Sequence, residues 1–331
     1  MYICRVKTKD KILKLLKKHG QLTVHELSEL LHASRQYVHR MISELEENRS
    51  VKKIGSAPRV YYSIVEENEQ TKSVEFISFE NEQFLSTHFL VVDPLGNSLE
   101  GLEAMKYWCE KQQLNLLKTT EEYIKTRNIY LQYLDENGMI DGKSKLINTQ
   151  GIGEIGVDNL FYLDFYAIER FGKTRLGTLM HYAKQGQNKR LMKQIVTEIN
   201  QRIHNYISLS KVDAIVFVPP TINRKIQIMS VLEKLLTIEL PAVKVDKIKT
   251  PIIIPQKALS KIFERIANAK NTFVVPLQKK YNHVLIIDDA VGSGATINEI
   301  ALKLKSKKVA QKITGIAITG SFKGFDVISE L

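Results

Sequence analysis

Several features that define whole classes of protein are missing from this sequence. It contains only two cysteines, Cys4 and Cys109, which give neither a disulfide framework nor the spacing of a metal site. Its longest apolar runs, such as residues 214–220, fall far short of the roughly 18 residues that a membrane-spanning helix needs. The first residues include scattered lysines and no cleavage site of small residues, unlike a signal peptide. We therefore expect a cytoplasmic protein without a membrane partner.

Positive and negative charges are distributed unevenly along the chain. Residues 1–65 contain 13 Lys and Arg against 6 Asp and Glu, residues 66–157 contain 8 against 16, and residues 158–331 contain 27 against 14. This switching predicts three domains with these boundaries, and polyanionic partners for the first and the last. For the last domain, a surface of solvated lysines without such a partner is an open alternative.

The first domain has the pattern of three helices followed by two short strands. An amphipathic helix stops at Gly20, and Thr23 begins a capping box that opens a second helix. Ser34 caps a third helix, and the strands 51–54 and 60–64 flank a basic turn. These signals together predict a small helical domain that ends in a β-hairpin.

This order of elements resembles the winged helix-turn-helix family. The resemblance implies that the exposed start of the third helix enters the major groove of DNA and that the hairpin, or wing, contacts phosphates. DNA or RNA is therefore the expected partner, and a winged helix that mediates only protein contacts is the alternative. The implied nucleic-acid contacts are Arg35, Gln36, Tyr37 and Arg40 on the helix, and Lys52, Lys53 and Arg59 in the wing.

Residues 66–157 show no constellation of catalytic residues. A strand and turn over 89–101, followed by helices over 101–114 and 119–134, predict an acidic α+β segment. Aromatic residues at helical spacing, including Trp108, are typical of a core. We expect this segment to connect the other two domains or to mediate assembly, either as a homodimer or with a partner protein.

Two glycine-containing stretches match nucleotide-binding motifs only in part. Residues 151–156, "GIGEIG", fit GxGxxG, but no hydrophobic strand precedes them, so we expect an interdomain hinge. Residues 171–177, "FGKTRLG", end like a phosphate-binding P-loop, but Ala167 stands where the pattern needs glycine and no strand is predicted before them. Neither stretch predicts a nucleotide site.

The last domain has the pattern of a doubly wound parallel sheet. Three β-rich runs, 214–218, 283–288 and 312–320, alternate with helical patterns, as expected for parallel strands buried on both faces. Ligands of such sheets bind just outside the carboxyl ends of the strands. The fold class of the whole chain is thus multidomain α/β, with a winged helix, an α+β middle segment and a doubly wound parallel sheet.

The loop after the second run has the chemistry of a ribose phosphate site. Small residues over 290–296 let backbone N–H groups and the next helix N-terminus bind an anion, and Ser293 and Thr296 add hydroxyl donors. Asp288 and Asp289, just before the loop, would repel a phosphate but accept hydrogen bonds from vicinal hydroxyls. A phosphate next to a vicinal diol indicates a ribose 5-phosphate.

The pattern Asp-Asp-x-x-x-Ser-Gly-x-Thr resembles the phosphoribosyl pyrophosphate (PRPP) motif of type I phosphoribosyltransferases. Three further segments, 182–195, 218–228 and 250–275, resemble in order those of the ComF-type branch, so the resemblance covers residues 158–331. A departure is Gly292, where many relatives have a second threonine. The last segment matches through Thr250, Gln256, Leu259, Ser260, Arg265, Asn268 and Phe273.

The resemblance implies roles for individual residues. Asp288 and Asp289 would hold the ribose hydroxyls and Arg224 would face the pyrophosphate, which makes these three the candidate catalytic residues. Mg²⁺ would arrive with PRPP, bound mainly by its oxygens and by water, so no protein metal site is expected. A mobile loop that closes over PRPP would include or adjoin Lys247, Lys249, Gln256 and Arg265. The implied PRPP contacts are Thr221, Arg224, Lys225, Asp288, Asp289, Ala290, Val291, Gly292, Ser293, Gly294, Ala295 and Thr296.

Three functions fit this combination of domains, and no residue presents itself as a general base for a nucleobase. The favoured one is a regulator of transcription that responds to PRPP or a ribonucleotide. A second is an active phosphoribosyl or ribosyl transferase, a glycosyltransferase that acts as an effector, for example a retron-associated toxin in antiviral defence. A third is a ComF-like accessory factor for competence. A fold that has lost its ligand is a further alternative.

Overall fold

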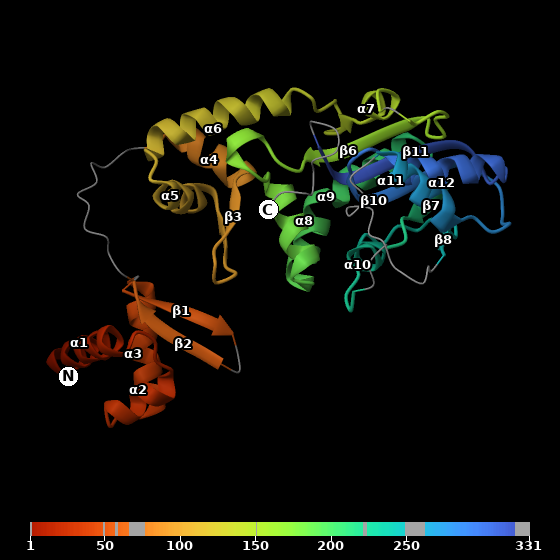
Figure 1. The fold of residues 1–331 in the computed structure, drawn as a ribbon. Helices are drawn as coiled ribbons and strands as arrows, with labels where there is room; N and C mark the ends of the chain where they lie inside the picture. Colours follow the sequence, from red (N-terminus) through yellow and green to blue (C-terminus); the bar gives the residue numbers. More distant parts are fainter. Residues whose placement is uncertain are drawn as a thin grey trace. The chain divides into compact units, whose positions relative to one another are not determined.

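The computed structural model of the chain describes residues 2–48, 50–56, 59–65, 77–149, 151–220, 224–248 and 262–321. Packing divides the chain into two compact units (Figure 1). The first consists of Met1–Glu75 with Val92–Asn97, and the second of Phe76–Val91 with Ser98–Leu331. Most of the predicted acidic segment therefore belongs to the same compact unit as the parallel sheet.

The first unit consists of three helices and a β-hairpin, as predicted. In the predicted capping box, Thr23 Oγ1 accepts a hydrogen bond from the Glu26 N–H at 3.2 Å, and the Glu26 carboxylate accepts one from the Thr23 N–H at 2.7 Å. Ser34 Oγ accepts from the Tyr37 N–H at 3.3 Å and so begins the third helix. The elements are α1 (Tyr2–His19), α2 (Val24–Leu30), α3 (Arg35–Glu47), β1 (Val51–Ser56) and β2 (Arg59–Ile64).

The core of this unit takes apolar side chains from each helix and from the hairpin. The hairpin is also joined to the helices through the backbone, because Leu22 and Tyr62 exchange N–H···O=C bonds of 3.1 and 2.8 Å. The predicted stripe on α3 faces inward, which leaves the opposite face of α3 open to solvent. The core residues are Ile12, Leu16, Leu22, Leu27, Val38, Met41, Ile42, Leu45, Val51 and Tyr62.

The second unit is built on a five-stranded sheet in the order β5-β6-β11-β10-β7. Its four longer strands are parallel, and β5 pairs antiparallel with β6 at one edge. The three predicted strands correspond to β7, β10 and β11, so the central parallel sheet is confirmed. The strand β6 was not predicted. The bounds are β5 (Ile140–Asp141), β6 (Asn159–Phe165), β7 (Ala214–Phe217), β10 (Tyr281–Val291) and β11 (Ala310–Gly320).

Helices cover both faces of this sheet. A Cβ at Gly315 would lie 2.6 Å from Ile297 of α12, whereas the hydroxyls of the neighbouring Thr314 and of Tyr206 from α9 are hydrogen-bonded to each other at 2.9 Å. Because successive residues of a strand point to opposite faces, α12 and α9 lie on opposite sides of the sheet. The helices α8 (Arg175–Gln185) and α9 (Lys189–Leu209) follow β6, and α10 (Ile228–Leu235) follows β7. The helix α11 (Ile262–Thr272) precedes β10, and α12 (Ala295–Ser306) lies between β10 and β11.

The described part of the acidic segment packs around an aromatic cluster. Phe89, Trp108, Tyr123 and Phe171 meet at ring-centroid distances of 4.7 to 6.4 Å, mostly edge to face, so Trp108 has the predicted core role. No helix in the described ranges is both long and apolar enough to cross a membrane. The remaining elements are α4 (Phe79–His88), β3 (Leu90–Val92), β4 (Ser98–Glu100), α5 (Gly101–Gln112), α6 (Leu116–Leu131), α7 (Lys143–Ile147), η1 (Glu169–Phe171), β8 (Asp246–Lys247) and β9 (Phe273–Val274).

The outer edge of β7 is bonded to a short extended segment rather than to another long strand. The Ile215 N–H donates to the Pro241 carbonyl at 3.0 Å, and the Val243 N–H donates to the Ile215 carbonyl at 2.7 Å. Ile215 and Ala242 thereby form a parallel bridge. At the opposite edge, β5 is only two residues long and pairs with Phe161 and Tyr162.

The structure corrects both glycine-motif predictions. The stretch 151–156 is not an interdomain hinge, because it lies inside the second unit, where the Gly156 N–H donates to Asn298 Oδ1 of α12 at 2.8 Å. A Cβ at Gly156 would lie 2.5 Å from the Leu302 nitrogen, so the loop packs directly on α12. A strand does precede the stretch 171–177, since β6 ends at Phe165.

Candidate functional site

The exposed face of α3 presents polar and basic side chains. Arg35, Gln36 and Arg40 are exposed there, as predicted, and so is His39, which the sequence prediction missed although it lies one helical turn after Arg35. Tyr37 is half-buried and has a packing role, because its hydroxyl donates to Thr8 Oγ1 at 3.4 Å. Its ring also lies 5.4 Å from the Arg40 guanidinium carbon, which restricts the direction of that side chain.

The wing presents basic side chains on β1. Lys52 and Lys53 are both exposed, and they pair with Ser63 and Tyr62 across the hairpin. Adjacent strand residues point to opposite faces, so the two lysines extend from different sides of the wing. The backbone of Arg59 opens β2, whereas its side chain lies outside the described residues.

Asp288 and Asp289 lie at the carboxyl end of β10, an inner strand of the sheet, and lysines from other elements act on them. Strand alternation directs Asp289 toward the face of the sheet covered by α8, where Lys184 forms an ion pair with it. Asp288 is influenced electrostatically by Lys247 of β8 as well as by Lys184. Lys184 therefore pairs with Asp289 by direct contact, whereas Lys247 acts on Asp288 through its charge.

The local environment changes the pKa of Asp288. Burial and the neighbouring Asp289 charge raise the pKa of Asp288 from its ordinary value to about 7. The Asp289 N–H donates to Asp288 Oδ1 at 2.8 Å, and the two lysines also favour the charged form, but these effects are smaller. Burial lowers the pKa of Lys247. Two carboxyl groups thus lie next to each other at the carboxyl end of β10.

The loop between β10 and α12 has one glycine that is required by geometry and one that is not. Gly294 has φ of +77°, and a Cβ there would lie 2.8 Å from Leu146 Cδ1. Gly292 has open space where its Cβ would be, so the threonine of many relatives would fit. Ser293 is buried and its hydroxyl accepts from the Ala295 N–H at 3.3 Å, at the first residue of α12. The predicted cradle therefore forms the N-terminus of a buried helix.

The end of α8 and the turn that follows it contact both the aspartates and the segment that begins with Arg224. Lys184 reaches Asp289, and Gln187 Oε1 accepts from the Ile226 N–H at 2.8 Å. Gln187 has φ of 49°, a left-handed conformation that is uncommon for a residue with a side chain. The turn thus holds the chain after Arg224 and Lys225 near the end of β10.

Several predicted site residues cannot be placed in this arrangement. Arg224 is half-buried and Lys225 is exposed, whereas Thr221, Lys249 and Gln256 lie outside the described residues, as does the side chain of Arg265. Sequence reasoning identified the segment 182–195 only as a family resemblance and assigned no role to Lys184 or Gln187.

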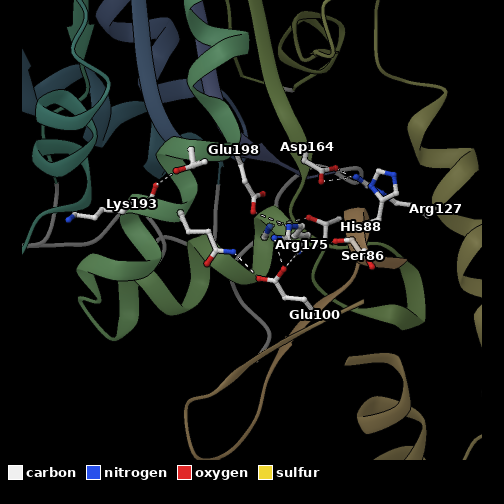
Figure 2. A network of polar contacts seen from close by, with 12 residues as sticks. Ser86, His88, Glu100, Arg127, Asp164, Arg175, Lys193 and Glu198 are labelled. Atoms are coloured by element: carbon white, nitrogen blue, oxygen red, sulfur yellow. Dashed lines mark hydrogen bonds and ion pairs between the residues drawn. The ribbon is translucent and has the colours of Figure 1, made fainter. Parts of the chain in front are cut away.

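A polar network fixes the other end of α8 (Figure 2). Arg175, the first residue of α8, donates through Nε to Glu198 Oε1 at 2.9 Å and through Nη1 to Glu100 Oε2 at 3.0 Å. Arg175 Nη1 also reaches the Ser86 carbonyl at 3.4 Å. Thr174 caps the helix by accepting from the Gly177 N–H at 3.1 Å. The network joins α8 to α4 and β4 of the acidic segment.

A second ion pair in Figure 2 joins α6 to β6. Arg127 donates to both carboxylate oxygens of Asp164, at 2.8 and 2.9 Å, and both residues are buried. Burial and the Arg127 charge lower the pKa of the neighbouring His88 to about 4. The acidic segment is therefore attached to the sheet by a desolvated, bidentate pair.

The comparisons with known proteins concern the first unit. Residues 7–49 match a family model described as "Winged helix-turn-helix DNA-binding". No curated protein matches the chain. The match, the three helices and the hairpin agree, so the first unit contains a winged helix-turn-helix DNA-binding domain.

Proposed function

We propose that the chain is a DNA-binding regulator whose second unit binds a 5-phosphorylated ribose, either PRPP or a ribonucleotide. The observation that supports this most is the end of β10, where two adjacent carboxylates precede a tight glycine loop and a helix N-terminus. That arrangement lies at the carboxyl end of a central parallel strand, where such sheets bind ligands. The resemblance to type I phosphoribosyltransferases supports the same ligand.

The chemistry of the site suits the two ends of the ligand. Asp288 and Asp289 are acceptors for the ribose hydroxyls, and the N-terminus of α12 with Thr296 suits the 5-phosphate. Arg224 and Lys225 would face a pyrophosphate. Mg²⁺ would arrive with PRPP, bound mainly by pyrophosphate oxygens and water because it loses water reluctantly, and its charge would offset that of the pyrophosphate.

The polar network at the start of α8 supports a regulatory role for this ligand. The helix that bears Lys184 also bears Arg175, which is bonded to Glu100 and Ser86 of the acidic segment. A ligand changes DNA binding only if it has different affinities for two conformations of the protein. A helix that contacts both the ligand site and the acidic segment is suited to that coupling.

A second candidate function is an active transferase that acts as an effector. It is favoured by Lys184 and Lys247, which place cations beside the diol carboxylates, where they could neutralise a departing pyrophosphate. Release of pyrophosphate from PRPP in the presence of nucleic acids, nucleosides or water would support it over the regulator.

The regulator is tested by measuring DNA affinity with and without ligand. A DNA site is first selected from a random pool with the full chain, and binding is then followed by fluorescence anisotropy with PRPP and Mg²⁺. We expect PRPP to change the affinity of the wild type, and the double variant Asp288→Asn, Asp289→Asn to bind DNA without responding. The exposed carboxylate Asp246, which pairs with Lys244, provides the control Asp246→Asn.

Two results would contradict the proposal. One is calorimetry that shows no binding of PRPP at millimolar concentration. The other is PRPP binding that leaves DNA affinity unchanged, which would favour the transferase if pyrophosphate is released.

A further inference from the structure

Lys184 occupies an acceptor that the proposed ligand needs. Its ammonium contacts Oδ2 of Asp289, and the two side chains are only 21% and 18% exposed. A ribose hydroxyl cannot donate to the same oxygen in the same direction while the ammonium is there. A ribose hydroxyl that takes this position on Oδ2 therefore requires Lys184 to move.

The start of the helix that bears Lys184 is anchored, so the movement that frees the carboxylate is assigned to the Lys184 side chain. At the start of α8, Arg175 is bonded to Glu198 and Glu100. Along the helix, a Cβ at Gly177 would lie 2.0 Å from the Tyr166 carbonyl oxygen, so the backbone of α8 packs directly against the chain after β6. A lysine side chain has four rotatable bonds and can change partners without any movement of the helix.

The position of the α8–α9 turn indicates where the displaced ammonium would go. Three residues after Lys184, Gln187 bonds the Ile226 N–H, in the segment that begins with Arg224 and Lys225. The predicted 5-phosphate loop instead continues into α12, on the opposite side of the sheet from α9. Lys184 thus lies between the diol carboxylate and the segment predicted to face a pyrophosphate.

We infer that Lys184 is an exchangeable counter-ion, which neutralises Asp289 in the free protein and transfers to the diphosphate of PRPP when the ribose hydroxyls take over that carboxylate. The inference rests on the proposed function of the site and adds a residue to it. It assigns Lys184 two opposite effects: it competes with the ribose and it attracts the diphosphate.

These opposite effects predict that replacing Lys184 changes the affinities for ribose 5-phosphate and for PRPP differently. Replacing Lys184 with methionine removes the competitor for Asp289, so ribose 5-phosphate should bind at least as tightly as to the wild type. PRPP should bind about tenfold or more weakly, because a charge-assisted hydrogen bond to its diphosphate is lost. A lysine that only stabilised the fold would weaken the binding of both ligands to the same extent.

The test is isothermal titration calorimetry of the full chain with ribose 5-phosphate and with PRPP, each with Mg²⁺. The variants are Lys184→Met, Lys184→Arg, which should retain most of the PRPP affinity, and Lys193→Met, an exposed lysine of α9 as the control. Weaker PRPP binding with undiminished ribose 5-phosphate binding supports the inference. Equal loss for both ligands, or no loss for PRPP, overturns it while leaving the proposed ligand site intact. A wild type that binds neither ligand overturns the proposed function and the inference with it.

Discussion

Replacing Arg127 with methionine should strongly destabilise the second unit. The Arg127 side chain is 5% exposed and that of Asp164 is 11% exposed, and two short hydrogen bonds join them. The variant leaves the Asp164 carboxylate buried, with the Phe165 N–H as its described donor at 2.8 Å. Removing one partner of a buried ion pair costs about 3–5 kcal/mol, since an uncompensated charge remains in the interior.

This magnitude can be measured by thermal unfolding of the full chain. A domain of this size loses about 2–4 °C in midpoint per kcal/mol, so Arg127→Met should lower the midpoint of the second unit by about 6–20 °C. The matched control is Arg170→Met, because Arg170 and Glu122 also form an ion pair but are 50% and 40% exposed. Exposed pairs contribute about 0–1 kcal/mol, so this control should shift the midpoint only slightly.

A double variant tests the physical reason. If the unpaired charge causes the loss, Arg127→Met combined with Asp164→Leu should be more stable than Arg127→Met alone, because no charge is then buried. The reasoning is refuted if Arg127→Met lowers the midpoint no more than Arg170→Met does, or if the double variant is the less stable one.

Three further predictions concern the loop, the interface and the carboxylates. Gly294→Ala should lower the unfolding midpoint by the equivalent of about 1–2 kcal/mol because of its left-handed backbone, whereas Gly292→Ala should change it little; equal shifts would contradict this. Arg35→Ala and Arg40→Ala should each weaken binding to the selected DNA by about 1–3 kcal/mol in anisotropy titrations, and unchanged binding would exclude them from the interface. The raised pKa of Asp288 means that the folded state retains a proton that the unfolded state releases between pH 4 and about 7, so this carboxyl lowers stability as pH rises. The unfolding midpoint of Asp288→Asn, measured relative to that of the wild type, should therefore be higher at pH 8 than at pH 5. A difference between variant and wild type that is the same at both pH values would refute the raised pKa of Asp288.

The sequence predicted those helices and strands that are determined by residues close to one another in the chain. The capping box at Thr23 and the cap at Ser34 fix where two helices begin, and both form as predicted. The three β-rich runs became parallel strands because apolar, mostly β-branched residues predominate in them. The strand β6 was missed because its sequence, "NLFYLDF", mixes aromatic and charged residues, and Asp164 is acceptable in it only because Arg127 neutralises it.

The ion pairs in and around the candidate site could not be predicted from such local signals. Lys184 and Asp289 are 105 residues apart, and Arg127 and Asp164 are 37 residues apart. A lysine at a helix end is usually a solvated surface residue, so nothing in its local sequence distinguishes Lys184 from Lys193. Its partner is decided by the order of the strands in the sheet, which brings the end of α8 within reach of the end of β10.

The bonds at the outer edge of β7 restrict how copies of the chain can associate. An exposed strand edge is a template on which another chain can add a strand, and proteins with such edges are prone to swapping and fibre formation. Here the outward N–H and carbonyl of Ile215 are already used by Pro241 and Val243, and the two-residue β5 offers little at the other edge. Addition of a strand from a second copy is therefore restricted at both described edges of this five-stranded sheet.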